Sequence, residues 1–520
     1  MGNPQVKLGS RELDCSLDFI EKHGSSIFFP QPFEVNAIRA SWNKIRPILQ
    51  RIDLLNYEAS PAYEIMAPKQ KYSFRPIHLL DPIDNILFTG LIHRIAPSIE
   101  SKRVTASKQI VNSYRMSMSP SGELILINDW SKHEKAIRKR IRKYKMVLKA
   151  DIVDFFPRVY HHRLENAIRD ITGLEYETRS LMRMIVKWSN GTSYGIPVGP
   201  LASNIIAEAL LIEVDDYLLS QKMDFIRWID DYLIFGNTRS DCYKYLTLLA
   251  TRLQKSQGLS LNMSKTRILT CSSFLAELDN KKDPIKKQRK TIIRVVFKGD
   301  PYRSIKYSDL TKEQKQLMDA LNVKETMENA LVGDLVDLET IRFVLNVLSA
   351  MRRPELVDII LENLPSLFPV SDAVARFLNV FDSISASKRN KIGEKILNYL
   401  MQESYVPDFQ ALWLLEPFTN SSKWNHLDKL RNIAGLSQNE FVIRQAVLAL
   451  GQVGNRSALL DLKYRINQST NWVRRAILYS CRKLPNDERG AFYKSVNIPV
   501  GSTTTELLEK AIIDYCNKSP

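Results

Sequence analysis

Cysteine and histidine are scarce in this sequence, and their spacing excludes two common kinds of site. The seven histidines show no His-x-x-x-His pattern, which argues against a zinc enzyme. No two of the five cysteines have the spacing of metal ligands; they are Cys15, Cys242, Cys271, Cys481 and Cys516. An odd number of scattered cysteines predicts reduced thiols and a cytoplasmic protein.

Long apolar runs are also missing. No stretch is apolar for long enough to span a bilayer, and the first residues lack the apolar core of a signal peptide. We therefore expect no membrane partner.

Positive charge, in contrast, is in excess. The chain has 74 Lys and Arg against 57 Asp and Glu, a formal net charge of +17. A surplus of this size favours a nucleic-acid partner, although a protein can be basic without one. The length of 520 residues and a hydrophobic content of 44% predict more than one domain.

The stretch from Phe225 to Phe235 places two adjacent carboxylates between two short apolar runs. The β-branched and aromatic residues on both sides predict a β-hairpin with Asp230 and Asp231 at its tight turn. Neighbouring like charges repel each other, and a cation such as Mg²⁺ would remove that cost. A solvated Asp-Asp turn is the plain alternative, so the metal hypothesis requires a further carboxylate.

An upstream strand supplies that carboxylate. The apolar run that starts at Met146 leads into Asp151, and Phe155, Phe156 and Pro157 follow. A carboxylate at a strand end, followed later by an Asp-Asp hairpin, is the arrangement of a polymerase palm, where metal ions bridge the attacking oxygen and the transferred phosphate. Such chemistry consists mostly of positioning and charge neutralisation.

A loop rich in glycine and proline, from Gly195 to Asn204, lies between the two carboxylate segments. It leads into an apolar helix predicted over about residues 205–219. Glycine lets the backbone approach a ligand closely, and a helix N-terminus favours phosphate. Alone the loop is weak evidence, but in this order it supports a nucleotide site.

Five motifs in this order resemble the reverse transcriptases of the prokaryotic group that includes retron, group II intron and phage-defence enzymes. Asp151 matches the first catalytic aspartate, and Asp230-Asp231 match the Tyr-x-Asp-Asp pair, with Trp228 in the Tyr position. The loop usually reads Gly-x-Pro-Gln-Gly, and Val198 stands in the Gln position. The remaining two motifs are Leu259–Thr266 and the fingers segment, which consists of Ala67–Lys69 together with Arg75–Ile77. The resemblance covers about residues 40–280.

The resemblance also implies a set of site residues. Asp151, Asp230 and Asp231 would be catalytic, and they would bind Mg²⁺, or Mn²⁺, together with Ile152. Contacts to the incoming dNTP are implied for Lys69, Arg75, Phe156, Gly195, Pro197, Gly199 and Lys265. The ring of Phe156 would reject a 2′-hydroxyl group and so select dNTPs, whereas we predict a core position for Phe155. Without the resemblance, Lys69 and Arg75 would be ordinary exposed cations.

Two basic clusters are candidates for nucleic-acid binding. The first precedes the Asp151 strand and includes Arg138, Arg140 and Arg142; the second includes Lys286, Lys287 and Arg289. A strand is expected after it, over residues 292–297. Such clusters would suit a phosphate backbone, but a solvated helix face and an exposed linker are the alternatives.

Helical periodicity dominates from about residue 305 onward. Residues 443–448 (Ile-Arg-Gln-Ala-Val-Leu) are echoed by residues 473–478 (Val-Arg-Arg-Ala-Ile-Leu), which resembles a HEAT-type repeat. A plain helical domain is the alternative. We expect an α+β reverse-transcriptase-like palm and fingers over residues 61–290, after an N-terminal extension over 1–60. An all-α HEAT-like domain over 291–520 would replace a conventional thumb.

This combination resembles the abortive-infection branch of phage-defence reverse transcriptases, encoded by bacteria or prophages. The resemblance implies untemplated, protein-primed DNA synthesis in a homo-oligomer. Its partners would be dNTPs and a single-stranded DNA product, which could be covalently attached. A templated enzyme that uses a noncoding RNA is one alternative, and a catalytically silent RNA-binding scaffold is another.

Overall fold

The computed structural model describes residues 4–69, 73–119, 123–279, 284–297, 305, 307–332, 336–496, 498 and 503–518. The chain forms two compact units, each built from separate segments. The first comprises Met1–Ile27, Arg46–Glu64 and Pro76–Lys287, and the second comprises Phe28–Ile45, Ile65–Arg75 and Gln288–Pro520. A division into consecutive domains does not express this interleaving, and the boundaries expected from the sequence stay a prediction.

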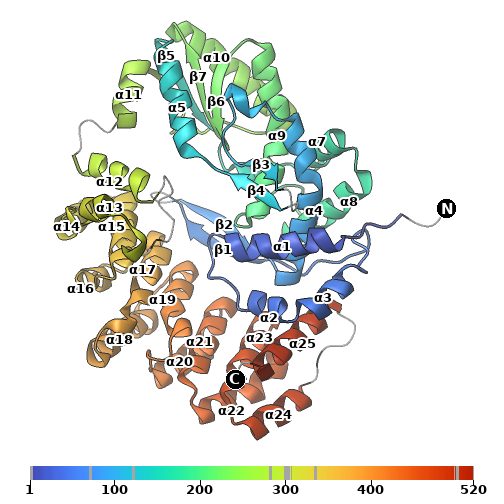
Figure 1. Cartoon of the computed structure of the whole chain (residues 1–520), viewed down its shortest axis with the longest axis vertical. Coiled ribbons are helices and arrows are strands. Elements are labelled where there is room, and N and C mark those ends of the chain that lie inside the picture. Colours follow the sequence, from blue (N-terminus) through green and yellow to red (C-terminus); the bar gives the residue numbers. More distant parts are fainter. Residues whose placement is uncertain are drawn as a thin grey trace. The chain divides into compact units, whose positions relative to one another are not determined.

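The chain contains both helices and strands up to about residue 280 (Figure 1). The helices there are α1 (Ser10–His23), α2 (Glu34–Ala40), α3 (Trp42–Leu49), α4 (Pro82–Lys102), α5 (Trp130–Ile141), α6 (Phe155–Arg158), α7 (His161–Thr172), α8 (Glu175–Trp188), α9 (Leu201–Ser220), α10 (Arg239–Arg252) and α11 (Cys271–Asp279). The strands are β1 (Tyr63–Pro68), β2 (Phe74–Leu79), β3 (Arg115–Met118), β4 (Leu124–Ile127), β5 (Met146–Asp151), β6 (Asp224–Trp228), β7 (Asp231–Gly236) and β8 (Arg267–Thr270). Helix α9 confirms the predicted apolar helix.

A four-stranded antiparallel sheet in the order β6-β7-β5-β8 carries the predicted carboxylate strands. The predicted hairpin is present as β6 and β7, and β5 pairs with β7. Because side chains alternate along a strand, each strand presents one set of residues to each face of the sheet.

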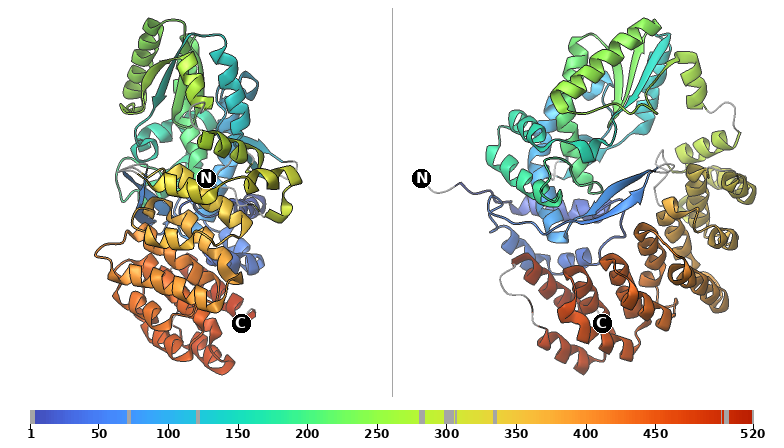
Figure 2. Two further views of the ribbon diagram at one scale, coloured as in Figure 1. Left: turned by 90° about the vertical axis from the view of Figure 1, so that its left-hand side faces the viewer. Right: turned by 180° about the vertical axis from the view of Figure 1, so that it is seen from behind.

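Helices cover both faces of this sheet (Figure 2). On one face, Val147, Ile226 and Leu233 pack with Ile137 of α5 and Phe274 of α11 in one hydrophobic cluster. Helix α10 packs against β5 and β7 from the opposite side. The sheet is thereby held between helices, and its strand ends at the β6–β7 turn remain partly exposed.

The rest of the chain is helical within the described residues. Its helices are α12 (Pro284–Val295), α13 (Lys312–Asp319), α14 (Val323–Leu331), α15 (Leu338–Met351), α16 (Val357–Glu362), α17 (Ser371–Leu378), α18 (Ala386–Gln402), α19 (Asp408–Asn420), α20 (Leu427–Leu436), α21 (Glu440–Val453), α22 (Arg456–Arg465), α23 (Asn471–Ser480), α24 (Asn486–Ser495) and α25 (Thr503–Lys518). The odd-numbered helices from α15 to α25 pack side by side in sequence order. The fold is therefore an α+β palm and fingers combined with an all-α region, as expected.

One predicted element is wrong. The strand expected over residues 292–297 is occupied by the end of helix α12 and the residues that follow it. A short run of β-branched residues does not distinguish a strand from a buried helix by its periodicity. Here Ile292 and Val296 are buried at helical spacing, which favours the helix.

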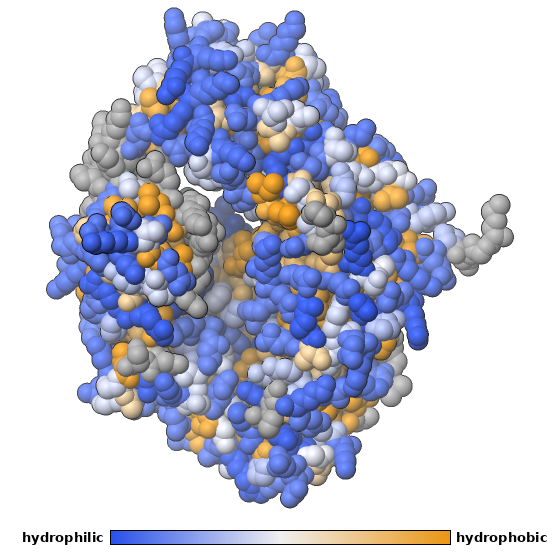
Figure 3. Space-filling model, viewed as in Figure 1, coloured by the Kyte–Doolittle hydropathy of each residue, from blue (hydrophilic) through white to orange (hydrophobic). Residues whose placement is uncertain are grey.

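Hydrophilic side chains predominate on the face drawn in Figure 3, and apolar side chains occur there in small groups. None of the helices within the described ranges combines the length and the apolarity needed to cross a membrane.

Candidate active site

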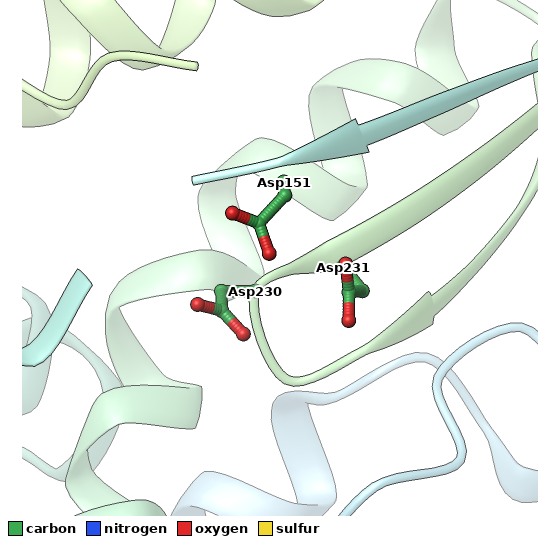
Figure 4. Close-up of side chains that lie close together, drawn as sticks. All are labelled: Asp151, Asp230 and Asp231. Carbon is green, nitrogen blue, oxygen red and sulfur yellow. The ribbon is translucent and has the colours of Figure 1, made fainter. Parts of the chain in front are cut away.

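The antiparallel register brings the three predicted aspartates together. Asp151 ends β5 and is paired directly with Asp231, the first residue of β7. Asp230 occupies the turn before it, so that one carboxylate oxygen from each residue lies within 4.8 Å of the others (Figure 4). Among the described residues this is the one cluster of at least three carboxylate, cysteine or histidine side chains that could hold a metal ion.

Electrostatic repulsion within the cluster is strong. Burial, together with the charges of Asp231 and Asp151, raises the pKa of Asp230 to about 7. Burial and Asp151 raise the pKa of Asp231 to about 6. Oxygen ligands that repel one another are the donor set that suits a hard divalent cation, so the residues present fit a metal site.

Lys265 contacts this cluster directly. Its Nζ lies 2.9 Å from Oδ1 of Asp151, and Asp151, Asp231 and Asp230 raise the pKa of Lys265 against the lowering effect of burial. The backbone fixes this contact, because the Asn262 amide donates to the Asp151 carbonyl at 2.7 Å and the Val153 amide to the Ser260 carbonyl at 2.9 Å. The predicted motif at residues 259–266 therefore lies against the strand that carries Asp151.

Ile152 is buried beside the cluster, and its amide donates to the Asp230 carbonyl at 3.2 Å. Its side chain is apolar, so only its backbone carbonyl could bind a metal ion. That assignment stays a prediction.

The glycine-rich loop meets the Asp151 segment at Phe156. The amide of Ile196 donates to the Phe156 carbonyl at 3.1 Å, and Phe156 is half-buried whereas Phe155 lies in the core. Gly199 has φ +134°, and a Cβ placed there would lie 2.3 Å from Ser26 Oγ and 2.8 Å from the His78 carbonyl oxygen. Only glycine fits at this position without a shift of its neighbours.

His78 holds the loop at Val198. The Val198 amide donates to His78 Nδ1 at 3.0 Å, and the His78 amide donates to the Val198 carbonyl at 2.8 Å. His78 Nε2 lies 3.1 Å from Glu64 Oε2, which fixes the orientation of the ring. Val198 and Pro197 are buried, so the loop is part of the packed palm, and its nucleotide contacts stay a prediction.

Lys69 and Arg75 lie near the turn end of the β1–β2 hairpin, in the second unit. The Lys69 amide donates to the Ser73 carbonyl at 2.7 Å, and the Arg75 guanidinium stacks over Phe28 at 4.4 Å from the ring centroid. Their contacts with a triphosphate stay a prediction.

The predicted basic residues differ in their surroundings. Arg138 pairs with Glu134 and Asp279, each at 2.6 Å, and the buried Arg140 pairs with Asp224 at 2.5 Å. Arg142 is exposed, and Arg289 pairs with Glu339 at 3.0 Å. The side chains of Lys286 and Lys287 lie outside the described residues. Nucleic-acid binding by these six residues stays a prediction, although Arg140 in particular has a structural role inside the palm.

Sequence reasoning missed a buried charge network behind the β6–β7 turn. Arg227 pairs with Asp215 at 2.6 Å and with Glu208 at 2.9 Å, and Glu208 also pairs with Arg103 at 3.0 Å. Burial raises the pKa of Glu208, but Arg103 and Arg227 outweigh it and hold that pKa below its usual value. An arginine inside an otherwise apolar strand next to the Asp pair was the available signal for such a network.

Aromatic side chains surround Trp228, which lies on the face of the sheet opposite Arg227. Its ring centroid lies 4.9 Å from that of Trp130 and 4.8 Å from that of His133. Burial, with the nearby charge of Arg140, lowers the pKa of His133 to about 4, so the ring is neutral at physiological pH. Trp228 is thus fixed in an aromatic cluster next to the β6–β7 turn.

The sequence matches no curated protein. One solved structure, telomerase from Candida albicans in complex with a TWJ fragment of telomeric RNA, is 12% identical, with a TM-score of 0.31, and the match covers 72% of this chain and 69% of that one. Apo telomerase from Candida tropicalis, truncated from its C-terminal domain, is 14% identical, with a TM-score of 0.30 and coverage of 41% and 51%, about half of its length.

One family match covers the strands and the turn that carry the three aspartates. Residues 67–307 match the family described as reverse transcriptase (RNA-dependent DNA polymerase). The matched region contains the three clustered aspartates, the glycine-rich loop and Lys265. Residues 67–307 of this chain are therefore similar in sequence to a reverse transcriptase domain.

Proposed function

We propose that this protein is a DNA polymerase that adds dNTPs by two-metal phosphoryl transfer at Asp151, Asp230 and Asp231. The observation that carries this proposal is the meeting of the three carboxylates at one end of the palm sheet. Divalent cations, Mg²⁺ or Mn²⁺, would neutralise the charge of the transferred phosphate when held there.

The chain's own residues position the reactants around this centre. Lys265 contacts Asp151 through its ammonium group. Once cations occupy the carboxylates, this ammonium group would be free to contact the phosphates of an incoming nucleotide. Phe156 is half-buried beside the loop, and its ring would pack under a deoxyribose and exclude a 2′-hydroxyl group.

The finer proposal is that synthesis needs no template and starts from a hydroxyl group of the protein, in an abortive-infection system against phage. Two departures from the family pattern support it. Val198 offers only an alkyl side chain where the family has a hydrogen-bonding amide, and Trp228 is held by Trp130 and His133. The succession of packed helices from α15 to α25 supports a HEAT-like region, and the proposal includes a homo-oligomer.

A templated enzyme that copies a noncoding RNA is the second candidate. The similarity of residues 67–307 to a family of RNA-dependent DNA polymerases favours it. The two candidates differ in what they require. A protein-primed enzyme needs only dNTPs and a divalent cation, whereas a templated enzyme needs RNA and a primer.

Labelled-nucleotide incorporation tests the proposal. Purified protein is incubated with Mg²⁺ and each labelled dNTP, without template or primer, and separated on a denaturing protein gel. We expect label that migrates with the protein and is removed by nuclease, and none with the Asp230→Asn variant. Label that appears only after addition of RNA and primer would establish the templated alternative. No incorporation under either condition would favour a silent scaffold and contradict polymerase activity.

A further inference from the structure

The turn that presents Asp230 has an unfavourable backbone conformation. Ile229 precedes Asp230 and has φ +56°, in the left-handed region that β-branched residues rarely adopt. Such a conformation persists only where the surrounding structure over-determines it. The groups that hold Ile229 therefore also determine where the Asp230 and Asp231 carboxylates lie.

Both polar groups of the Ile229 backbone are held by buried side chains. Its amide donates to Ser113 Oγ at 2.8 Å, and its carbonyl accepts from Arg227 Nη1 at 2.8 Å. Ser113 and Arg227 are fully buried. Ser113 and Arg227 come from different parts of the chain. Together they hold the two peptide units that flank the Ile229 Cα, one on each side.

Glu208 of helix α9 joins the two halves of this clamp. Ser113 Oγ donates to Glu208 Oε1 at 2.8 Å, and Arg227 Nη2 donates to Glu208 Oε2 at 2.9 Å. Asp215, two turns further along α9, accepts from Arg227 Nε at 2.9 Å and from Nη2 at 2.6 Å. The guanidinium is thereby fixed in one orientation by two carboxylates of the same helix.

The network and the catalytic carboxylates lie on opposite faces of the sheet. Arg227 and Trp228 are neighbours on β6, so their side chains point to opposite faces, and Tyr232 and Asp231 alternate in the same way on β7. Arg227 is paired with Tyr232, and the Tyr232 hydroxyl donates to Asp215 at 3.4 Å. Helix α9 thus supports the turn from behind.

We propose that Ser113, Glu208 and Arg227 are positioning residues that force Ile229 into its left-handed conformation and so set the metal-binding geometry of Asp230 and Asp231. This inference rests on the proposed function only in treating the three aspartates as a metal site. Side chains that orient metal ligands from behind typically change metal affinity when they are altered.

Direct Mn²⁺ binding tests the inference without catalysis. The full-length protein is titrated with Mn²⁺ and free Mn²⁺ is followed by electron paramagnetic resonance, with Asp231→Asn defining the binding that belongs to the site. We expect Ser113→Ala to raise the Kd about tenfold. The matched control is Ser180→Ala, which removes an equally buried hydroxyl that donates only to the Tyr176 carbonyl and should leave the Kd unchanged.

A second variant separates positioning from general stability. Ile229→Gly removes the need to force the backbone, because glycine adopts positive φ freely. In the Ser113→Ala background it should return the Kd toward the wild-type value, whereas a merely structural serine would give additive losses. Additive losses, equal effects of Ser113→Ala and Ser180→Ala, or wild-type Mn²⁺ binding that does not depend on Asp231 would each overturn the inference. Absence of dNTP incorporation with the expected Mn²⁺ results would overturn the proposed function alone.

Discussion

At the scale of single residues, the ionised carboxylate of Asp230 destabilises the folded protein. Its pKa is raised to about 7 by burial and by the neighbouring aspartates, whereas an unfolded chain gives an aspartate a pKa of about 4. The folded protein therefore binds a proton that the unfolded chain releases. Between about pH 4 and 7 this group makes the free energy of unfolding fall as pH rises. A metal ion would offset that loss.

Asp230→Asn should therefore stabilise the metal-free protein near about pH 8. We expect a higher melting temperature than wild type in EDTA, by an amount on the order of a few degrees, with a smaller difference near about pH 5. Thermal unfolding at both pH values, with EDTA and with Mg²⁺, measures it, and Mg²⁺ should stabilise the wild type more than the variant. Asp170→Asn, at an exposed carboxylate, is the control. A wild type that is no less stable than the variant in EDTA near about pH 8 would contradict the repulsion.

The side chains of the candidate site could be found from the sequence, but those that position them could not. Asp151, Asp230, Asp231 and Lys265 were indicated by their match to the family motifs, and the structure brings these four together. Ser113 and Glu208 lie far from the turn in the sequence and belong to no motif. Their role arises only from the packing of α9 against the sheet, which determines which hydroxyl and which carboxylate reach the Ile229 peptide.

At the scale of elements, the glycine-rich loop shows why one glycine is required. Gly199→Ala would place a methyl group 2.8 Å from the His78 carbonyl oxygen, a backbone atom that cannot turn aside. We expect a loss of about 1–3 kcal/mol in the free energy of unfolding, with weaker dNTP binding because the loop must shift. Denaturant unfolding and dNTP titration measure the two effects.

Gly173→Ala is the matched control for this prediction. Gly173 also has positive φ, at +69°, but a Cβ there meets no atom within 4 Å. It therefore reports the cost of backbone conformation without a clash. An effect of Gly199→Ala on dNTP binding that is no greater than that of Gly173→Ala would show that the close approach to His78 is unimportant.

Elements with a regular pattern were predicted more reliably than those with a short apolar run. The apolar helix after the loop and the β6–β7 hairpin are both present. The strand expected over residues 292–297 was wrong, since a few β-branched residues are compatible with either structure until their buried neighbours are known. Here Ile292 and Val296, which are four residues apart, are both buried, and this spacing favours a helix.

At the scale of the whole molecule, the interleaving of the two units has a consequence for any shortened protein. Residues 28–45 belong to the unit that is otherwise built from residues 65–75 and 288–520. Arg444 Nη2 lies 2.5 Å from Glu34 Oε2. The rings of Phe33 and Tyr479 are stacked, with their centroids 4.1 Å apart. Helix α2 also packs on α25. The early segment therefore obtains its buried environment from the end of the chain.

A protein that ends at Lys287 keeps the reverse transcriptase motifs but loses these partners. Phe29, Val35 and Ile38, all buried in the full chain, would become exposed, and a contiguous apolar surface promotes aggregation. We expect low soluble yield and soluble aggregates by size-exclusion chromatography. Replacing the three residues by serine in the shortened protein should restore a monodisperse species if their exposure is the cause. A monodisperse shortened protein without those replacements would show that residues 28–45 do not need the helical region, and that the palm folds as an independent domain.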